Sequence, residues 1–236
     1  SYYMCPKIAI LQAMLPPSLK PKSSALRSPK IKYEKYLKIK QYNEDGLTDK
    51  QIEILRLIKD NDEVLKSDIK SVSIVNKLIE KDLIEVVLKE KNRLNLKQNV
   101  IYSKKNLTPL QETVVNEFIN TDKDISLLEG VTGSGKSEVY LHLAEHYLKQ
   151  NKNILMLVPE ISLTPMMIDM FLSRFENKVA VLHSDLTPSE KYDEYRRILK
   201  DDVRVVVGAR SAIFAPIKNI GLIILDEEHA ETYKQD

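Results

Sequence analysis

The chain has 236 residues, of which 43% are hydrophobic and 30% charged, so it can bury a sizeable core in one or two domains. Its single cysteine, Cys5, excludes an internal disulfide framework and a zinc site made of this chain's own cysteines. No stretch is apolar enough for a membrane span and no signal peptide opens the chain, so a cytoplasmic protein is expected.

The net charge of +2 conceals an uneven distribution. Residues 1–105 contain 22 lysines and arginines against 13 acids, whereas residues 106–236 contain 14 against 21. This division favours two domains with different partners, and a basic half is typical of nucleic-acid surfaces. A lysine-rich surface without a nucleic-acid partner is the alternative.

The N-terminal segment combines apolar and basic stretches. Residues 1–15 predict a short amphipathic element that a proline pair ends. Residues 20–40 are lysine-rich, and Lys30, Lys32 and Lys35 are candidate DNA contacts. Interleaved tyrosines suit base stacking beside phosphate contacts, but a solvated connecting strand explains the same pattern.

The next segment predicts a small α+β domain. A helix is expected to begin at Thr48, a short element to cover Leu65 to Ile69, and a further helix to run from Ser73 to Lys81. Two β-rich runs, Leu83–Leu88 and Arg93–Val100, follow as a ribbon. Three helices and a two-stranded ribbon are typical of a winged helix, which binds either DNA or protein.

Residues 106–236 alternate apolar runs with amphipathic segments. The predicted elements are Ile125–Leu128, Lys136–Gln150, Asn153–Val158, Leu163–Phe175, Val179–Leu182, Pro188–Leu199, Val203–Val207 and Leu222–Asp226. This alternation predicts an α/β domain with a parallel sheet covered by helices on both faces. The predicted domain boundaries are therefore 1–22, 23–105 and 106–236.

An octapeptide after the first apolar run fits the phosphate-binding P-loop, G-x-x-x-x-G-K-[ST]. Its glycines let backbone N–H groups point at phosphate oxygens, Lys136 adds positive charge, and the Ser137 hydroxyl can ligate Mg²⁺. The candidate nucleotide-binding residues of this loop are Gly130, Thr132, Gly133, Ser134, Gly135, Lys136 and Ser137.

A second motif supports the first. The last apolar run ends in acids, as a buried parallel strand that delivers carboxylates to its C-terminal edge would. Asp226 is placed to hold Mg²⁺ through water, and Glu227 to orient or deprotonate the attacking water. Together, Lys136, Asp226 and Glu227 predict a nucleoside-triphosphate site.

The sequences of four further segments are similar to motifs of one protein family. They are Leu107–Gln111, Val158–Pro165, Leu182–Leu186 and Gly208–Pro216. The last three follow predicted strands, where the loops of open α/β sheets form binding surfaces suited to backbone-phosphate contacts. With the GVTGSGKS loop and the DEEHAETYKQ sequence, the chain resembles the superfamily-2 DNA helicases, and among them the bacterial primosomal replication-restart helicases.

The resemblance implies roles for individual residues. Gln111 reads the adenine edge, and Thr164, Arg210 and Ser211 contact a single DNA strand. Glu228, His229 and Tyr233 link the nucleotide site to an aromatic-rich, DNA-sensing loop. The implied fold is a RecA-like first helicase lobe, preceded by a winged helix and the close of an N-terminal DNA-binding domain.

The resemblance also implies an activity and partners. The expected function is ATP-dependent 3′-to-5′ unwinding of DNA in replication restart, with ATP and Mg²⁺. Forked or single-stranded DNA, a single-stranded DNA-binding protein and primosome proteins are the expected partners. The family's second lobe and its two-zinc module are absent from this sequence, so we expect a fragment with little or no unwinding activity.

Three other functions remain open. Another superfamily-2 translocase would share every motif and differ in its preference for forked DNA. A kinase or transporter ATPase would share the P-loop, although the DEEH tetrad at 226–229 suits helicases better. A nucleotide- and DNA-binding module without catalysis would show no nucleotide turnover.

Overall fold

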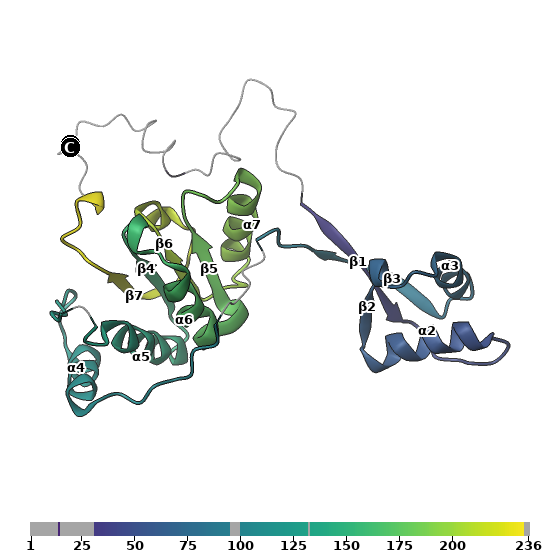
Figure 1. The fold of residues 1–236 in the computed structure, drawn as a ribbon, viewed down its shortest axis with the longest axis horizontal. Coiled ribbons are helices and arrows are strands. Elements are labelled where there is room, and N and C mark those ends of the chain that lie inside the picture. The colour runs from purple at the N-terminus through teal and green to yellow at the C-terminus, as the bar shows by residue number, and fades with distance from the viewer. Residues whose placement is uncertain (1–13, 15–30, 95–99, 132, 234–236) are drawn as a thin grey trace, which may run out of the picture. The chain divides into compact units, whose positions relative to one another are not determined.

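The computed structural model describes residues 14, 31–94, 100–131 and 133–233, drawn in colour in Figure 1. It divides into two compact units, one of them Lys30–Arg93 and the other formed in its described part mainly by Leu94 onward. The amphipathic element predicted over residues 1–15 lies almost entirely outside the described residues, as do Cys5, Lys30 and Thr132. Among the helices that the structure describes, none is long and apolar enough to cross a membrane.

The smaller unit is a three-stranded antiparallel sheet with two α-helices. In chain order its elements are β1 (Tyr33–Ile39), α2 (Asp49–Asp60), β2 (Glu63–Leu65), α3 (Val72–Glu80) and β3 (Ile84–Glu90). The sheet order is β2-β1-β3, which makes β1 the central strand. Leu37 of β1 is fully buried and packs against Leu55 and Ile58 of α2 and Leu78 of α3.

The winged-helix assignment is not confirmed, and most of the predicted ribbon run Arg93–Val100 lies outside the described residues. In the described structure β3 pairs along its whole length with β1, from Tyr33 opposite Glu90 to Ile39 opposite Ile84. The element predicted at Leu65–Ile69 is the end of β2 followed by a single 3₁₀ turn. The lysine-rich run 33–39 is the central strand and pairs with β2 and β3, which both come later in the chain. Local composition does not reveal such pairing.

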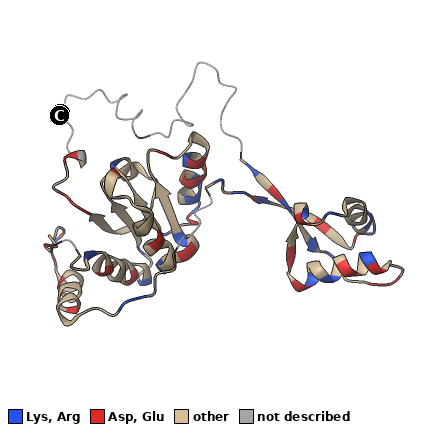
Figure 2. Ribbon diagram, viewed as in Figure 1, with Lys and Arg blue, Asp and Glu red and all other residues tan. Residues whose placement is uncertain are grey.

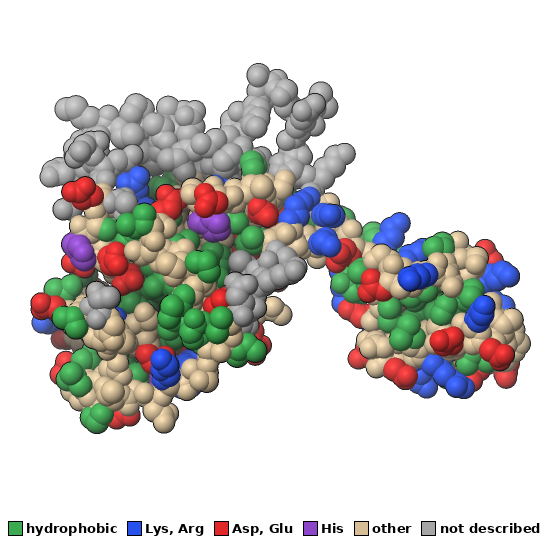
Figure 3. Space-filling model, viewed as in Figure 1, with side chains coloured by type: hydrophobic (Ala, Val, Ile, Leu, Met, Phe, Trp, Pro, Cys, Tyr) green, Lys and Arg blue, Asp and Glu red, His purple; other side chains and the backbone are tan. Residues whose placement is uncertain are grey.

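Positive charge does not concentrate on the smaller unit. Residues 31–93 hold 14 lysines and arginines against 13 acids, and the two signs alternate along α2 (Figure 2). The same mixture covers the face of this unit that Figure 3 presents. Lys40 lies 2.6 Å from Asp82, and Arg56 lies 2.7 Å from Glu44. The basic excess of residues 1–105 therefore comes mainly from residues outside 31–93.

The larger unit is an α/β domain. In chain order its elements are α4 (Pro109–Asn120), α5 (Lys136–Lys149), β4 (Asn153–Leu157), α6 (Pro165–Phe175), β5 (Val179–Leu182), α7 (Pro188–Leu199), β6 (Val205–Gly208) and β7 (Ile220–Leu225). The four strands are parallel in the order β5-β6-β4-β7. The predicted parallel α/β sheet is confirmed.

Helices cover both faces of this sheet (Figure 1). Alternate β4 side chains, Ile154 and Met156, pack against α5 and α6, whereas Leu155 and Leu157 face Ile198 of α7. On the edge strand β5, the Val181 amide donates a hydrogen bond at 3.1 Å to the carboxylate of fully buried Glu194, which takes the place of a neighbouring strand's carbonyl. At the other edge no further strand of the described structure pairs with β7, and Ile223 is 51% exposed.

The strand predicted at Ile125–Leu128 does not form. The run is irregular, and the side chains of Ile125 and Leu127 are 88% and 73% exposed. Only Leu128 packs into the core, beside Leu222 of β7. An apolar run becomes a strand only where a neighbouring strand supplies ladder hydrogen bonds, and in the described structure 125–128 has no such neighbour.

Candidate nucleotide-binding site

The P-loop candidate forms a tight turn that opens α5. Gly133 and Gly135 have φ values of +81° and +84°, in the left-handed region that favours glycine. The Lys136 ammonium donates to the carbonyl oxygens of Gly130 at 2.5 Å and Val131 at 3.3 Å. The lysine thus closes the loop on itself, and its charge lies at the position where the helix N-terminus favours an anion.

Gln111 connects this loop to the preceding helix. Its side-chain carbonyl accepts a hydrogen bond from the Thr108 amide at 2.9 Å, which caps α4. Its side-chain NH₂ group donates to the Ser134 carbonyl at 3.1 Å. A Cβ atom at Gly135 would lie 2.4 Å from Gln111 Nε2, so a side chain there would displace the Gln111 amide from the Ser134 carbonyl.

Asp226 follows β7 directly and makes three hydrogen bonds. Its amide donates to the Leu157 carbonyl at 2.9 Å, in the pattern of the β4–β7 ladder. The Tyr233 hydroxyl donates to its main-chain carbonyl at 3.1 Å. The Tyr140 hydroxyl, from α5, donates to its carboxylate oxygen Oδ1, also at 3.1 Å. Asp226 is 9% exposed, so these bonds replace most of its contact with water.

Burial and the neighbouring acids act on both tyrosines. Burial, and after it the charge of Asp226, raise the pKa of Tyr140 well above its usual value. Burial, with Asp226 and Glu227, raises the pKa of Tyr233 to about 12. Both phenols therefore remain protonated donors near neutral pH.

Glu227 lies in a strained backbone position. Its φ is +50°, which is uncommon for a residue with a side chain and is frequent at functional sites. Its carboxylate accepts a hydrogen bond from the Ser162 hydroxyl at 3.0 Å. Glu228 and His229 follow with their side chains 58% and 78% exposed, and His229 Nδ1 lies 3.7 Å from Glu228 Oε2.

The predicted DNA contacts lie at the carboxyl ends of two adjacent strands. Thr164 follows β4 and caps α6, accepting a hydrogen bond from the Met167 amide at 3.3 Å. Arg210 and Ser211 follow β6 in a 3₁₀ helix, and all three side chains are exposed. Glu160 connects the loop after β4 to the loop after β5, because it accepts a hydrogen bond from the Ser184 amide at 3.2 Å.

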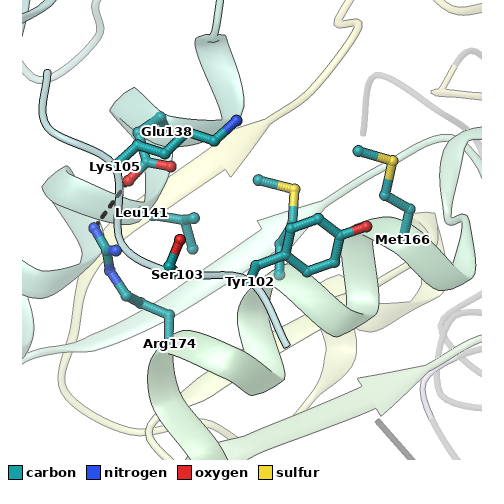
Figure 4. Close-up of a pocket in the computed structure, with 8 residues that line it drawn as sticks. Tyr102, Ser103, Lys105, Glu138, Leu141, Met166 and Arg174 are labelled. Atoms are coloured by element: carbon teal, nitrogen blue, oxygen red, sulfur yellow. Dashed lines mark hydrogen bonds and ion pairs between the residues drawn. The ribbon is translucent and has the colours of Figure 1, made fainter. Parts of the chain in front are cut away.

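A small cavity lies beside the segment that precedes α4, and none of its lining residues belongs to the P-loop. Tyr102, Ser103 and Lys105 come from this segment, and Met166 and Arg174 come from α6 (Figure 4). The remaining lining residues are Glu138, Leu141 and Met170. The cavity measures only about 50 Å³, which suits a few water molecules rather than a nucleotide.

Sequence reasoning missed the contacts that join these motifs. Tyr140 and Ser162 were assigned no role, yet one bonds Asp226 and the other Glu227. The spacing of Tyr140, four residues after Lys136 on the same helix, was the available signal. Lys32 and Lys35 are exposed on the smaller unit, remote in sequence from the P-loop.

A parallel sheet with a glycine-rich loop before one helix and acids after one strand defines the P-loop class of nucleotide-binding proteins. The family model described as "Type III restriction enzyme, res subunit" matches residues 104–235. The chain therefore belongs to this family.

Curated relatives of the chain carry the name of a replication-restart protein. The chain is 44% identical over 181 residues to the Replication restart protein PriA of Bacillus subtilis (strain 168), a match that covers 74% of this chain and 22% of that protein. Its identity is 44% over 175 residues to the protein of this name from Synechocystis sp. (strain ATCC 27184 / PCC 6803 / Kazusa), covering 73% and 21%. The resemblance to replication-restart helicases predicted from the motifs is confirmed.

The relative from Haemophilus influenzae (strain ATCC 51907 / DSM 11121 / KW20 / Rd), also named Replication restart protein PriA, is 37% identical over 194 residues, 79% of this chain and 27% of that protein. The chain thus spans between 21% and 27% of the length of these three relatives. Among solved structures, the UvsW helicase from Bacteriophage T4 matches with a TM-score of 0.41 and 26% identity, over 55% of this chain and 46% of that one.

Proposed function

We propose that residues 106–236 are the first ATP-binding lobe of a superfamily-2 DNA helicase, and that the longer protein unwinds DNA in the 3′-to-5′ direction during replication restart. The observation that carries this proposal is the Tyr140–Asp226 hydrogen bond, which brings the P-loop helix α5 and the acids after β7 to one place. The relatives named Replication restart protein PriA support the biological setting.

The residues present suit ATP with Mg²⁺. Ser137 and Asp226 offer a hydroxyl and a carboxylate, the oxygen donors that Mg²⁺ prefers, and Mg²⁺ takes few protein ligands when phosphates complete its shell. When bound, the ion neutralises charge on the β- and γ-phosphates. Lys136 exchanges its loop carbonyls for phosphate oxygens, and Glu227 orients the attacking water.

The remaining roles follow the family. In this proposal Gln111 contacts the base, Thr164, Arg210 and Ser211 bind the phosphates of a single strand, and the Glu228–Tyr233 segment couples the two sites. Lys30, Lys32 and Lys35 add charge from the N-terminal part, which also carries residues 1–22 as the close of a DNA-binding domain. Forked DNA, a single-stranded DNA-binding protein and primosome proteins are the proposed partners of the longer protein.

Substitution of Gly135 by alanine is expected to lower the affinity for ATP by more than about 10-fold. The new methyl group strains a residue at φ +84° and displaces Gln111 Nε2 from its hydrogen bond with the Ser134 carbonyl. Gly46→Ala is the matched control, because it carries similar strain at φ +67° with no atom within 4 Å of the new Cβ. Titration with a fluorescent ATP analogue makes the comparison, and equal affinities in both variants would contradict the proposed loop.

DNA affinity is expected to fall steeply as salt rises, since phosphate contacts release counterions. Substituting Lys32 and Lys35 by alanine should reduce the slope of log affinity against log salt by roughly 0.7–0.9 per lysine. Lys40→Ala is the control, because the Lys40 ammonium already bonds Asp82 at 2.6 Å. A salt-independent affinity, measured by fluorescence anisotropy with a forked oligonucleotide, would remove the electrostatic argument for these lysines.

ATP turnover with and without forked DNA tests the proposed function itself. We expect this chain to bind ATP but turn it over slowly or not at all, because one lobe lacks the arginine that stabilises transition-state charge, typically worth factors of about 10³ or more. The longer protein should show DNA-stimulated turnover. Absence of DNA stimulation there would instead favour a nucleotide- and DNA-binding module without catalysis.

A further inference from the structure

The buried hydroxyl of Tyr140 is a polar group that the roles described above do not use. Tyr140 lies in α5 and is 7% exposed, with its ring in the core between the sheet and α6. Its hydroxyl makes one hydrogen bond that the structure resolves, to Asp226 Oδ1 at 3.1 Å. A phenol that served packing alone could be a phenylalanine without an unpaired polar group.

The position of Tyr140 on α5 matters for the metal. It lies three residues after Ser137, and residues three apart occupy the same side of a helix. The hydroxyl that bonds Asp226 and the hydroxyl proposed to bind Mg²⁺ therefore come from successive turns of one helix. The bond sets the distance between the carboxylate after β7 and the start of α5.

Asp226 is oriented completely only when Tyr140 contributes. The Leu157 carbonyl and the Tyr233 hydroxyl fix its main chain, but neither touches the carboxylate. Tyr140 is the donor to that carboxylate in the described structure, and it occupies Oδ1, which leaves Oδ2 without such a donor. Groups that hold a metal ligand in this way commonly change metal affinity or activity by about 10–100-fold when removed.

We infer that Tyr140 is a positioning residue for the metal, which holds the Asp226 carboxylate in register with Ser137. The inference rests on the proposed nucleotide site and assigns one further residue to it. Tyr140 touches neither nucleotide nor metal and acts through Asp226.

The test compares two tyrosines of the same helix. Tyr140→Phe removes the hydroxyl that bonds Asp226, whereas Tyr147→Phe removes one for which the structure records no hydrogen bond. Each variant of the full chain is titrated with Mn²⁺ in the presence of ATP, and bound Mn²⁺ is followed by electron paramagnetic resonance. We expect Tyr140→Phe to weaken Mn²⁺ binding about 10-fold, with ATP affinity in EDTA unchanged and Tyr147→Phe like the wild type.

A double-mutant cycle separates positioning from packing. In the Asp226→Ala background, Tyr140→Phe should cause no further loss of Mn²⁺ affinity, because the group that it orients is gone. Thermal unfolding should shift by only about 2–4 °C, since phenylalanine keeps the ring in place.

The possible failures are distinguishable. If Tyr140→Phe binds Mn²⁺ as the wild type does, the positioning role is wrong while the nucleotide site stands. Equal losses in the presence and absence of Asp226 would also overturn the role, because the effect would then be structural. If the wild type binds no ATP, the proposed function and this inference fail together.

Discussion

Lys136→Ala is expected to weaken binding of ATP by about 10–100-fold and to abolish nucleotide turnover in the longer protein. The ammonium is the charged group of the loop, and charge-assisted hydrogen bonds to phosphate contribute about 1.5–3 kcal/mol each. In the structure it bonds the Gly130 and Val131 carbonyls, so it already lies within the loop that phosphates would enter.

A control on the same helix isolates the effect of position. Lys149 lies in the last turn of α5 and is exposed, so Lys149→Ala removes the same charge at the opposite end. Affinities from a fluorescent ATP analogue should be unchanged in this control. DNA binding should remain largely intact in Lys136→Ala, and its collapse would show that nucleotide and DNA roles are not separate.

Arg174→Ala is expected to destabilise the larger unit by about 3 kcal/mol, the largest stability effect that we predict. The Arg174 side chain is 8% exposed, and its Nη2 lies 3.0 Å from Glu138 Oε1. Its Nε lies 2.5 Å from Glu145 Oε1 in an ion pair without hydrogen-bond geometry. Removing one partner of a buried ion pair leaves the other charge uncompensated, at a cost of roughly 3–5 kcal/mol.

The same network connects three segments of the larger unit. Glu138 and Glu145 are on α5, Arg174 is on α6, and Lys104 lies in the segment before α4, 2.6 Å from Glu145. Burial opposes ionisation of Glu145, but Lys104 and Arg174 more than offset it and hold the pKa of Glu145 below its usual range. This stabilisation is present above the unfolded-state pKa and is lost as pH falls through the lowered folded-state pKa.

Urea unfolding provides the measurement for Arg174. Lys178→Ala, which removes an exposed cation just after α6, serves as control and should stay within about 0.5 kcal/mol of the wild type. Adding Glu138→Gln to Arg174→Ala should recover part of the loss, because one uncompensated charge disappears. A change below about 1 kcal/mol in Arg174→Ala would show that solvent screens the network.

Sequence patterns located most of the larger unit because its signals are local. The runs at 153–158 and 179–182 are apolar and short, and 188–199 alternates on a helical period, so each is specified by its own residues. Ile125–Leu128 has the same apolar composition but makes no strand in the described structure, since pairing depends on a neighbour. Tyr33–Ile39 is lysine-rich and yet forms the central strand of its sheet, because it pairs with strands that lie far away in sequence.

The candidate site divides in the same way. The glycine-rich loop is one continuous stretch of sequence, and so are the acids after β7. The position of the first on a turn and of the second at a strand end could therefore be predicted. The bonds from Tyr140 to Asp226 and from Ser162 to Glu227 join residues 86 and 65 positions apart. The first contact depends on how α5 packs against the sheet and the second on β4 and β7 being neighbours, neither of which a single sequence specifies.

The most direct test of the nucleotide-binding lobe is calorimetric titration of this chain with ATP in the presence of Mg²⁺. We expect saturable binding of one ATP per chain, and a loss of that binding when the Lys136→Ala variant is titrated with EDTA in place of Mg²⁺. Absence of binding at millimolar ATP, or binding that survives both changes, would contradict this expectation.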